Sequence, residues 1–232
     1  MKRIVVLTGA GVSQESGLPT FRDLGGIWQQ VRIEEVASPV AFRESPERVH
    51  DFYNQRRRNL QRAEIRPNTA HRALADFEAR WPGGFALITQ NVDNLHERAG
   101  SRRLLHMHGE LLRARCQHCE ESVAWLGDLS VETACPHCGA AGGMRPDVVW
   151  FGETPCHLDE IDDLISRCDL FVAIGTSGVV YPAASLGARA TARGATTVEI
   201  NVESTGSNHF QRRFLGPASE QVPRFFSELL PA

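Results

Sequence analysis

The sequence lacks three features that would point to a particular kind of partner. Its 25 basic and 28 acidic side chains nearly cancel, and no long run of one charge occurs, so the electrostatic field that holds nucleic acid is not expected. No apolar run approaches the about 20 residues that a membrane-spanning helix needs, and the apolar stretch at residues 4–7 is too short for the core of a signal peptide. We therefore expect a cytoplasmic protein that acts on small molecules or proteins.

Aromatic residues are also scarce, at 7%, but 232 residues of which 42% are hydrophobic can bury one good core. Short runs rich in Val and Ile, separated by helix-like stretches, predict the buried parallel strands of an α/β sheet. The clearest runs are residues 4–7, 85–88, 170–174 and 197–200. Helices are expected behind the capping side chains of Ser45 and Asn68, and over about residues 183–193 and 219–230.

Two stretches interrupt this alternation of strands and helices. Residues 22–68 carry no strand signal and predict an insertion with at least one helix, whereas residues 112–147 combine four cysteines with many Gly and Pro. The six cysteines of a cytoplasmic chain are expected to be metal ligands or free thiols, because disulfides are rare in that compartment.

The four clustered cysteines form two C-x2-C knuckles, fifteen residues apart, that can converge on one zinc ion; they are Cys116, Cys119, Cys135 and Cys138. Four sulfur ligands leave no open position for water, so the metal is expected to stabilise a lobe too small to build its own core. His118 and His137 lie inside the knuckles and could replace a thiolate, although a complete cysteine set makes them bystanders. A zinc ribbon that binds nucleic acid is disfavoured by the acidic residues of the stretch.

Two glycine-rich turns follow predicted strands. Gly9-Ala10-Gly11 comes directly after residues 4–7, and Gly175-Thr176-Ser177 after residues 170–174. Small residues at the carboxyl ends of parallel strands let backbone N–H groups approach a pyrophosphate. The first turn departs from the usual dinucleotide fingerprint, since Gln14 occupies the third glycine position, and this disfavours an ordinary dehydrogenase. Either turn alone could also be no more than a tight connection.

Taken in chain order, the motifs closely resemble those of the sirtuins. The first turn continues through Ser13 into Ser16-Gly17-Leu18-Pro19-Thr20-Phe21-Arg22 and matches the first family signature. Gln90-Asn91-Val92-Asp93 matches the second signature, His108-Gly109 the third, the cysteine quartet the fourth, and Gly175-Thr176-Ser177 with Asn201 the last. The likeness runs from residue 7 to about residue 230, although residues 203–208 look less like the family.

The resemblance implies one catalytic domain over residues 1–232 that uses NAD to remove acyl groups from protein lysines. Its Rossmann-like core, with helices on both faces of a parallel sheet, would comprise about residues 1–25, 68–111 and 148–232, with a helical insertion at about 26–67 and a zinc-binding lobe at about 112–147. The residues expected to bind NAD are Gly9, Ala10, Gly11, Ser13, Gly17, Thr20, Phe21, Arg22, Trp28, Gln90, Asn91, Asp93, Gly175, Thr176, Ser177, Asn201, Val202, Glu203 and Ala218.

The resemblance also implies the catalytic set His108, Asn91 and Asp93. The acyl-lysine carbonyl would attack C1′ of the nicotinamide ribose, and His108 would act as general base on a ribose hydroxyl. Products would be free lysine, nicotinamide and O-acyl-ADP-ribose. Asn91 would orient the ribose and Asp93 the carboxamide, although both could simply cap the turn after their strand. His106 competes with His108 as a base, and the two could also form a His-x-His metal pair.

Residues 148–153 would pair with the substrate backbone through Val149, Gly152 and Glu153, with Trp150 and Phe151 beside the lysine stem, unless the segment is one more core strand. Tyr53 and Arg56 are three apart on a predicted helix and share one face. They resemble the Tyr-x-x-Arg pair of sirtuins that remove acidic acyl groups, and Ala37, sixteen residues earlier, matches the small residue that widens the acyl pocket. A guanidinium and a phenol suit a terminal carboxylate.

Two other functions remain open from the sequence. An ADP-ribosyltransferase could use the same chemistry at C1′ of the ribose, but residues 149–153 indicate a channel for acyl-lysine. A non-enzymic NAD sensor or zinc scaffold is opposed by the presence of Asn91, Asp93 and His108 together. The sequence therefore favours a deacylase that acts on acetyl-, succinyl- and malonyl-lysine.

Overall fold

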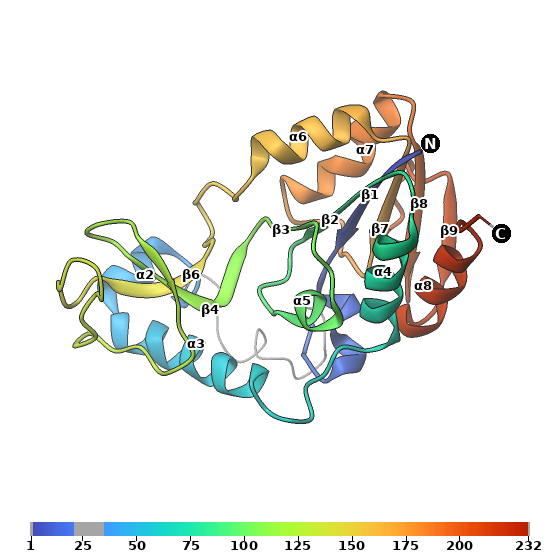
Figure 1. Cartoon of the computed structure of the whole chain (residues 1–232). Coiled ribbons are helices and arrows are strands. Elements are labelled where there is room, and N and C mark those ends of the chain that lie inside the picture. The colour runs from blue at the N-terminus through green and yellow to red at the C-terminus, as the bar shows by residue number, and fades with distance from the viewer. Residues whose placement is uncertain (1, 21–34, 232) are drawn as a thin grey trace.

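The computed structural model describes residues 2–20 and 35–231 (Figure 1). One sheet has six strands in the order β3-β2-β1-β7-β8-β9, and every neighbouring pair is parallel. Its strands are β1 (Arg3–Thr8), β2 (Gly84–Thr89), β3 (Leu104–His106), β7 (Leu170–Ile174), β8 (Thr196–Asn201) and β9 (Arg212–Leu215). When these strands are counted among themselves, the order is that of a doubly wound dinucleotide-binding sheet, whose chain reverses direction between β1 and β7. The predicted Rossmann-like sheet is confirmed.

Helices cover both faces of this sheet (Figure 1). α4 (Thr69–Arg80) and α8 (Ala218–Ser227) lie on one face, and α6 (Leu158–Arg167) and α7 (Leu186–Ala192) lie on the other. Successive residues of a strand point to opposite faces, so Ile4 packs with α4 and α8 whereas Val5 packs with α6 and α7. Burial on both faces explains why these strands read as continuous apolar runs in the sequence.

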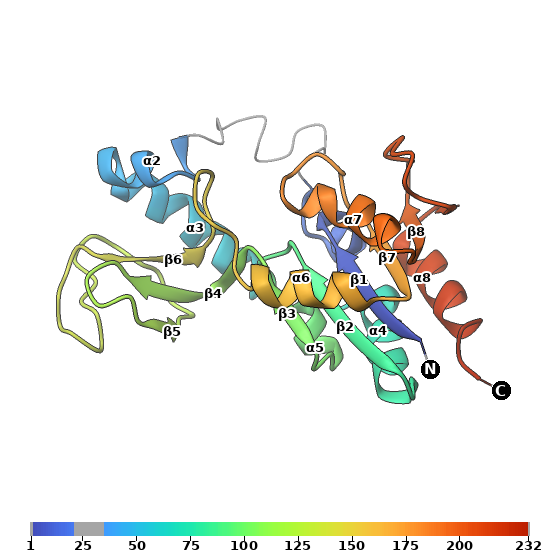
Figure 2. The same cartoon turned by 90° about the horizontal axis from the view of Figure 1, so that it is seen from above.

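A second lobe lies at the end of the molecule opposite α8 (Figure 2). It combines α2 (Pro39–Glu44) and α3 (Pro46–Leu60) with an antiparallel sheet of β4 (Gly109–Cys116), β5 (Ser122–Ala124) and β6 (Met144–Val148). One apolar cluster joins α2, α3, β4 and β6, so the helical insertion and the cysteine-rich stretch pack as one unit. This three-stranded sheet was not expected from the sequence.

Helix starts agree with the sequence in one case and differ in another. The side chain of Asn68 accepts hydrogen bonds from the backbone N–H groups of Ala70 and His71 at the start of α4, as predicted. Ser45 precedes α3 but its side chain makes no capping bond, so that prediction is wrong. Its backbone N–H instead continues α2 by donating to Ala41, while Ser38 caps α2. Among the described residues, no helix is both long and apolar enough to cross a membrane.

Short elements connect the parallel sheet to the second lobe. The turns η1 (Ala10–Val12) and η2 (Gln14–Ser16) follow β1, and α5 (Leu95–Ala99) follows β2. The predicted helix at about 183–193 is confirmed: a 3-10 helix, η4 (Ala183–Ser185), continues directly into α7. The carboxyl ends of β1, β2 and β7 therefore face the second lobe, and the candidate site lies between them.

Candidate active site between the parallel sheet and the second lobe

The two glycine-rich turns meet where the chain reverses direction in the sheet. The backbone N–H of Gly11 donates to the carbonyl oxygen of Gly175 at 2.9 Å, and that of Gly9 donates to Ile174 at 3.0 Å. A Cβ at Gly11 would lie 2.8 Å from the Cα of Gly175, which leaves no room for any side chain. Gly175 also has a φ of 59°, a conformation that favours glycine. The glycines therefore bring two strand ends into backbone contact.

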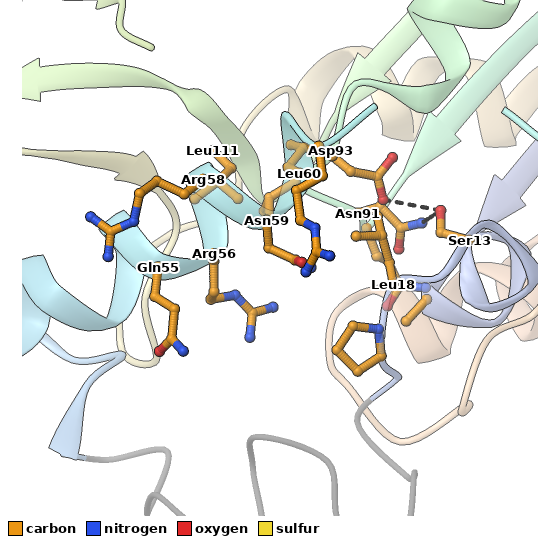
Figure 3. Close-up of a pocket in the computed structure, with 15 residues that line it drawn as sticks. Ser13, Leu18, Gln55, Arg56, Arg58, Asn59, Leu60, Asn91, Asp93 and Leu111 are labelled. Carbon is orange, nitrogen blue, oxygen red and sulfur yellow. Dashed lines mark hydrogen bonds between the residues drawn. The ribbon is translucent and has the colours of Figure 1, made fainter. Parts of the chain in front are cut away.

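Three polar side chains form a buried network beside these turns. Ser13 Oγ donates to Asp93 Oδ2 at 3.0 Å, and Asn91 Nδ2 donates to Ser13 Oγ at 3.1 Å and to the carbonyl of Gly9 at 3.2 Å (Figure 3). Burial raises the pKa of Asp93, although bonds from the Leu95 N–H and from Ser13 oppose that shift. The bond from Leu95 shows that Asp93 also caps the turn into α5. The carboxylate of Asp93 thus accepts one hydrogen bond that shapes the start of α5 and another from Ser13 within the site.

A pocket of about 510 Å³ opens between the network and α3 (Figure 3). Ser13, Asn91 and Asp93 line one side of it, and Arg56 reaches it from the second lobe. Its other described lining residues are Ala10, Leu18, Pro19, Gln55, Arg58, Asn59, Leu60, Arg62, Gln90, Val92 and Leu111. Several residues expected at a nucleotide site therefore share one cavity with the expected acyl-selecting arginine.

His108 lies two residues after β3 and directly before β4, and it is not among the described residues that line the pocket. Its Nδ1 lies 3.1 Å from the carbonyl oxygen of Gln90. A carbonyl only accepts, so Nδ1 carries the proton and Nε2 of the neutral ring is free to accept one. Burial lowers the pKa of His108, and the bond to Gln90 only partly offsets this. The ring is therefore neutral near pH 7, as a general base must be.

His106 makes a different set of contacts from His108. Its Nε2 lies 2.6 Å from Oε1 of Glu97, and its Nδ1 lies 3.1 Å from the carbonyl oxygen of Asn91. Among the described residues, the groups that could hold a metal are the cysteine quartet and a cluster of Glu97, His106 and Glu110, and neither includes His108. The alternative of a shared His-x-His metal pair therefore finds no support.

The segment after β6 is tied to the site at two points. The backbone N–H of Val149 donates to the carbonyl of His108 at 2.9 Å, and that of Phe151 donates to Ala37 at 3.0 Å. Gly152 has a φ of 89°, and the side chain of Glu153 accepts from the Trp150 N–H at 2.8 Å, which closes the turn. Val149 therefore lies beside His108, and Gly152 and Glu153 form the turn that follows.

Trp150 does not lie beside an open channel as expected, because it is 2% exposed and packs within the second lobe. The guanidinium of Arg145 lies 3.3 Å from its ring centroid and pairs with Glu153 at 2.6 Å. The interpretation of Trp150 as a core residue is the correct one. Phe151 is 54% exposed and remains available to a substrate.

Tyr53 and Arg56 both lie on α3 but differ in exposure. Tyr53 is 4% exposed, is not among the described lining residues, and accepts a hydrogen bond at 2.9 Å from the indole N–H of Trp150. Burial raises the pKa of Tyr53 to about 12, against the opposing charge of Arg56. Burial lowers the pKa of Arg56, and Tyr53 opposes that shift. A partly desolvated guanidinium at the wall of a pocket favours an anionic ligand.

The four cysteines of the second lobe converge as their spacing predicts. Cys116 and Cys138 have sulfurs 3.8 Å apart, those of Cys119 and Cys135 are 3.7 Å apart, and all four lie within 4.8 Å of one another. Four thiolates at about 2.3 Å from a tetrahedral zinc ion would be about 3.8 Å apart, so the set fits that metal. The exposed His118 and His137 contribute backbone N–H groups to the sulfurs of Cys116 and Cys135.

Some contributors to the site were not predicted from the sequence. His71 lies 3.4 Å from the hydroxyl of Ser13, and burial lowers its pKa to about 4. Asn68 donates from Nδ2 to the carbonyl of Val12 at 2.8 Å and so ties α4 to the first turn. The pocket-lining residues Gln55 and Asn59 lie four apart on α3, a spacing that could have placed them on one face.

Comparison with known proteins decides the family. A sequence profile described as "Sir2 family" matches residues 9–182, three quarters of the chain. The chain belongs to the Sir2 family. A protein from Bdellovibrio bacteriovorus named "NAD-dependent protein deacylase" is 54% identical over 230 residues, covering 99% of this chain and 97% of that protein. An Escherichia coli protein of the same name is 51% identical over 229 residues, covering 98% of this chain and 82% of that protein.

Solved structures give the same result. A Sir2 homologue in complex with NAD superposes with a TM-score of 0.88 at 40% identity, covering 99% of this chain and 91% of that one. A variant of a Sir2 homologue bound to ADP-ribose superposes with a TM-score of 0.90 at 40% identity, covering 98% and 92%. One of these proteins is bound to NAD and the other to ADP-ribose, which is part of NAD, the cofactor that the sequence motifs of this Sir2 chain predict.

The remaining expected NAD residues of this Sir2 chain lie in several parts of the sequence. Asn201 donates from Nδ2 to the carbonyl of Thr176 at 2.9 Å and so joins β8 to the second glycine turn. Val202 and Glu203 are exposed, whereas Ala218 is buried at the start of α8. Gly17 and Thr20 lie in the segment after η2. Phe21, Arg22 and Trp28 lie outside the described residues.

Proposed function

We propose that this Sir2 chain is an NAD-dependent protein-lysine deacylase that removes acetyl groups and also succinyl and malonyl groups, yielding nicotinamide and O-acyl-ADP-ribose. The observation that carries the proposal is the shared pocket. Ser13, Asn91 and Asp93 line it together with Arg56, so the expected cofactor site and a cation for an acyl carboxylate face the same space. The names of relatives above 50% identity support the deacylase over an ADP-ribosyltransferase.

NAD, when bound, supplies a glycosidic bond to nicotinamide, and breaking this bond drives transfer of the acyl group from lysine to ADP-ribose. The chain would hold the cofactor at the two glycine turns, whose small residues let a pyrophosphate approach the backbone at the carboxyl ends of β1 and β7. Asn91 would orient the ribose, and Asp93, held by Ser13, would hold the carboxamide. Since these side chains already contact one another, little ordering is needed when NAD binds.

His108 would take the proton in this reaction. With its Nδ1–H donated to Gln90, Nε2 is the atom that would accept a proton from a ribose hydroxyl. The backbone bond between Val149 and His108 places the proposed substrate segment beside that base. Val149, Gly152 and Glu153 would pair with the substrate chain, and Ala37, which is small and buried, would leave room for the acyl group.

Arg56 would bind the terminal carboxylate of a succinyl or malonyl group. An anion that leaves water needs a paired cation, and a guanidinium can bind both carboxylate oxygens. Tyr53 would add a donor: its oxygen already accepts from Trp150, so its own O–H remains to be donated. Acetyl-lysine carries no such charge and gains nothing from Arg56.

The cysteine quartet would hold one structural zinc ion through Cys116, Cys119, Cys135 and Cys138. A bound zinc there would stabilise the second lobe and would take no part in the proton transfer. We also propose a cytoplasmic location, where thiols stay reduced and free to bind metal, and acylated protein lysines as partners, with neither nucleic acid nor membrane.

Mass spectrometry of one peptide carrying acetyl-, malonyl- or succinyl-lysine tests the proposal. With NAD, loss of the acyl mass and formation of O-acyl-ADP-ribose are expected on all three peptides, and no loss is expected without NAD. His108→Ala is the matched control for non-enzymic deacylation. ADP-ribose attached to the peptide, with the acyl group retained, would favour the transferase. Activity on acetyl-lysine alone would leave the deacylase and remove the acidic-acyl assignment.

A further inference from the structure

Two histidines near the end of β3 bind successive carbonyls of the segment that follows β2. His108 binds the carbonyl of Gln90, and His106 binds that of Asn91, each through Nδ1 at 3.1 Å. His106 has a second partner, because its Nε2 lies 2.6 Å from the carboxylate of Glu97 on α5. Both partners of His106 are therefore acceptors, whereas among the described residues His108 has the carbonyl of Gln90 as its acceptor.

This difference determines the protonation state that each ring needs in order to make its hydrogen bonds. A neutral imidazole carries one N–H and cannot donate to two acceptors, whereas an imidazolium carries two. The side chain of Glu97 is 38% exposed, and its carboxylate accepts from Nε2 of His106. The two bonds of His106 exist together only when its ring is positively charged. His108 satisfies its carbonyl while neutral.

We propose that His106 is a positioning residue, kept as an imidazolium by Glu97, that fixes the carbonyl of Asn91 and so holds Asn91 and Asp93 against Ser13. The segment from Gln90 to Asp93 carries two of the three proposed catalytic side chains, and His106 ties it to α5. A neutral His106 releases one of its two bonds and loosens that segment. The inference rests on the proposed function for its kinetic effect but not for the protonation state itself.

Taken together, the groups around His106 favour its positively charged form. Burial lowers its pKa, but the hydrogen bond and charge of Glu97, the Asn91 carbonyl and the charge of Glu110 on β4 outweigh that effect, so the pKa is raised. His96 on α5 is buried with its pKa well below the usual value, and its Nε2 lies 3.0 Å from Thr8 Oγ1. It adds no positive charge. Asp93, on the segment after β2, adds a further carboxyl nearby.

These shifts place the pKa of His108 below the ordinary value of a histidine and the pKa of His106 above it. His108, with its lowered pKa, is the required base above that pKa; His106, with its raised pKa, is the required cation below it. The site is therefore complete only between the two. Two groups with pKa values pushed apart produce a bell-shaped pH profile. His106 would set its alkaline limb.

Imidazole NMR tests the charge directly, without any activity. In long-range ¹H–¹⁵N spectra at pH 6.5, both ring nitrogens of His106 are expected to be protonated, with deprotonation only at higher pH. The signals are assigned by their loss in His106→Gln. A His106 that is neutral at pH 6.5 would overturn the proposal whether or not the protein is a deacylase.

Glu97→Gln tests the consequence for catalysis. The amide oxygen still accepts from Nε2, so the contact is kept while the charge is lost. The alkaline limb of kcat/KM for NAD is expected to move down by about one to two pH units, because a hydrogen bond to a charged group contributes about 1.5–3 kcal/mol. The acid limb, set by His108, is expected to stay. Glu220→Gln, on the exposed surface of α8, is the matched control.

An alkaline limb that does not move in Glu97→Gln, while NMR shows the lowered pKa of His106, would mean that its charge does not matter to the site. If no acyl peptide is turned over, the same limb is read from NAD affinity by calorimetry across pH. Failure of the deacylase proposal is thus distinguishable from failure of this one.

Discussion

His108 is the single residue on which the proposed chemistry depends most. His108→Ala removes the proton acceptor, and we expect kcat to fall at least about a hundredfold because general base catalysis contributes about 10²–10⁴. NAD affinity should stay near that of the unchanged protein, since the pocket is lined by other residues. Calorimetry for binding and peptide deacylation for turnover separate the two effects. Near-normal turnover would show that another group is the base.

The pH dependence of the reaction follows from the same ring. Burial lowers the pKa of His108, so the neutral base forms at a lower pH than for an exposed histidine and is lost only as pH falls through the lowered value. The acid limb of kcat/KM is expected below pH 6.5. A profile measured from pH 5 to 9 checks this, and an acid limb at or above pH 7 would contradict it.

Arg56 determines selectivity if the acidic-acyl assignment holds. Arg56→Met should lower kcat/KM on succinyl-lysine by about thirty- to a thousandfold, equivalent to about 2–4 kcal/mol, because the carboxylate loses its paired cation. Activity on acetyl-lysine should change little or improve. Parallel kinetics on both forms of one peptide decide this. Equal losses on both would mean that Arg56 supports the fold or the cofactor.

Tyr53→Phe is expected to change selectivity in the same direction as Arg56→Met, but by less. It keeps the ring among the buried residues of the second lobe and removes one donor, so the loss on succinyl-lysine should be smaller than for Arg56→Met. The variant also deprives the indole N–H of Trp150 of its acceptor. Thermal unfolding should therefore be measured beside the kinetics. A selectivity loss without a change in Tm supports a direct contact with the acyl group.

Helix α3 connects the cysteine-rich sheet to the rest of the second lobe. Two adjacent arginines on this helix, Arg57 and Arg58, make different kinds of contact. Arg57 is 0% exposed and donates to the carbonyls of Leu111 and Gly127 and to Asn54 Oδ1. The side chain of Arg58 is 60% exposed and pairs at the surface with Asp128. Two adjacent residues of the same helix thus make buried hydrogen bonds in one case and an exposed ion pair in the other.

Replacement of each arginine by methionine separates these roles. Arg57→Met leaves buried carbonyls without donors, and we expect the free energy of unfolding to fall by about 2–4 kcal/mol. Arg58→Met, the matched control, should cost less than about 1 kcal/mol, because exposed ion pairs contribute little. Urea unfolding of both variants measures the difference. Equal effects would show that the buried bonds do not hold α3 to β4.

The molecule as a whole joins a parallel sheet that has large apolar clusters to a lobe whose cysteine-rich part has a small one. The sheet has apolar clusters on both faces, whereas the cluster around the cysteines contains only five buried residues. Removal of zinc by a chelator should therefore unfold the cysteine-rich part first and stop catalysis as a result. Hydrogen exchange should show loss of protection at residues 109–148 while β1, β2 and β7 stay protected. Direct inhibition with the lobe intact, reversed by other catalytic metals, would contradict a structural role.

Much of the fold could be predicted because its signals are local. Strands covered on both faces are continuous apolar runs, and residues 4–7, 85–88, 170–174 and 197–200 all lie within strands of the sheet. The sequence correctly predicted Asn68 as a helix cap. It wrongly predicted Ser45 as one, because whether a capping side chain makes its hydrogen bond depends on how the preceding helix ends. The boundaries of the single predicted domain and the roles of the NAD residues stay predictions.

The sequence by itself determined the family, the parallel sheet and the zinc-ligand set, because short motifs and strand patterns need no distant partner to be read. Only the tertiary structure decided which side chains share the pocket, that Trp150 is buried against Tyr53, and that His106 lies between two acceptors. Those acceptors come from residues fifteen and nine positions away. No spacing rule links such positions, since their approach depends on how β2, α5 and β3 pack together.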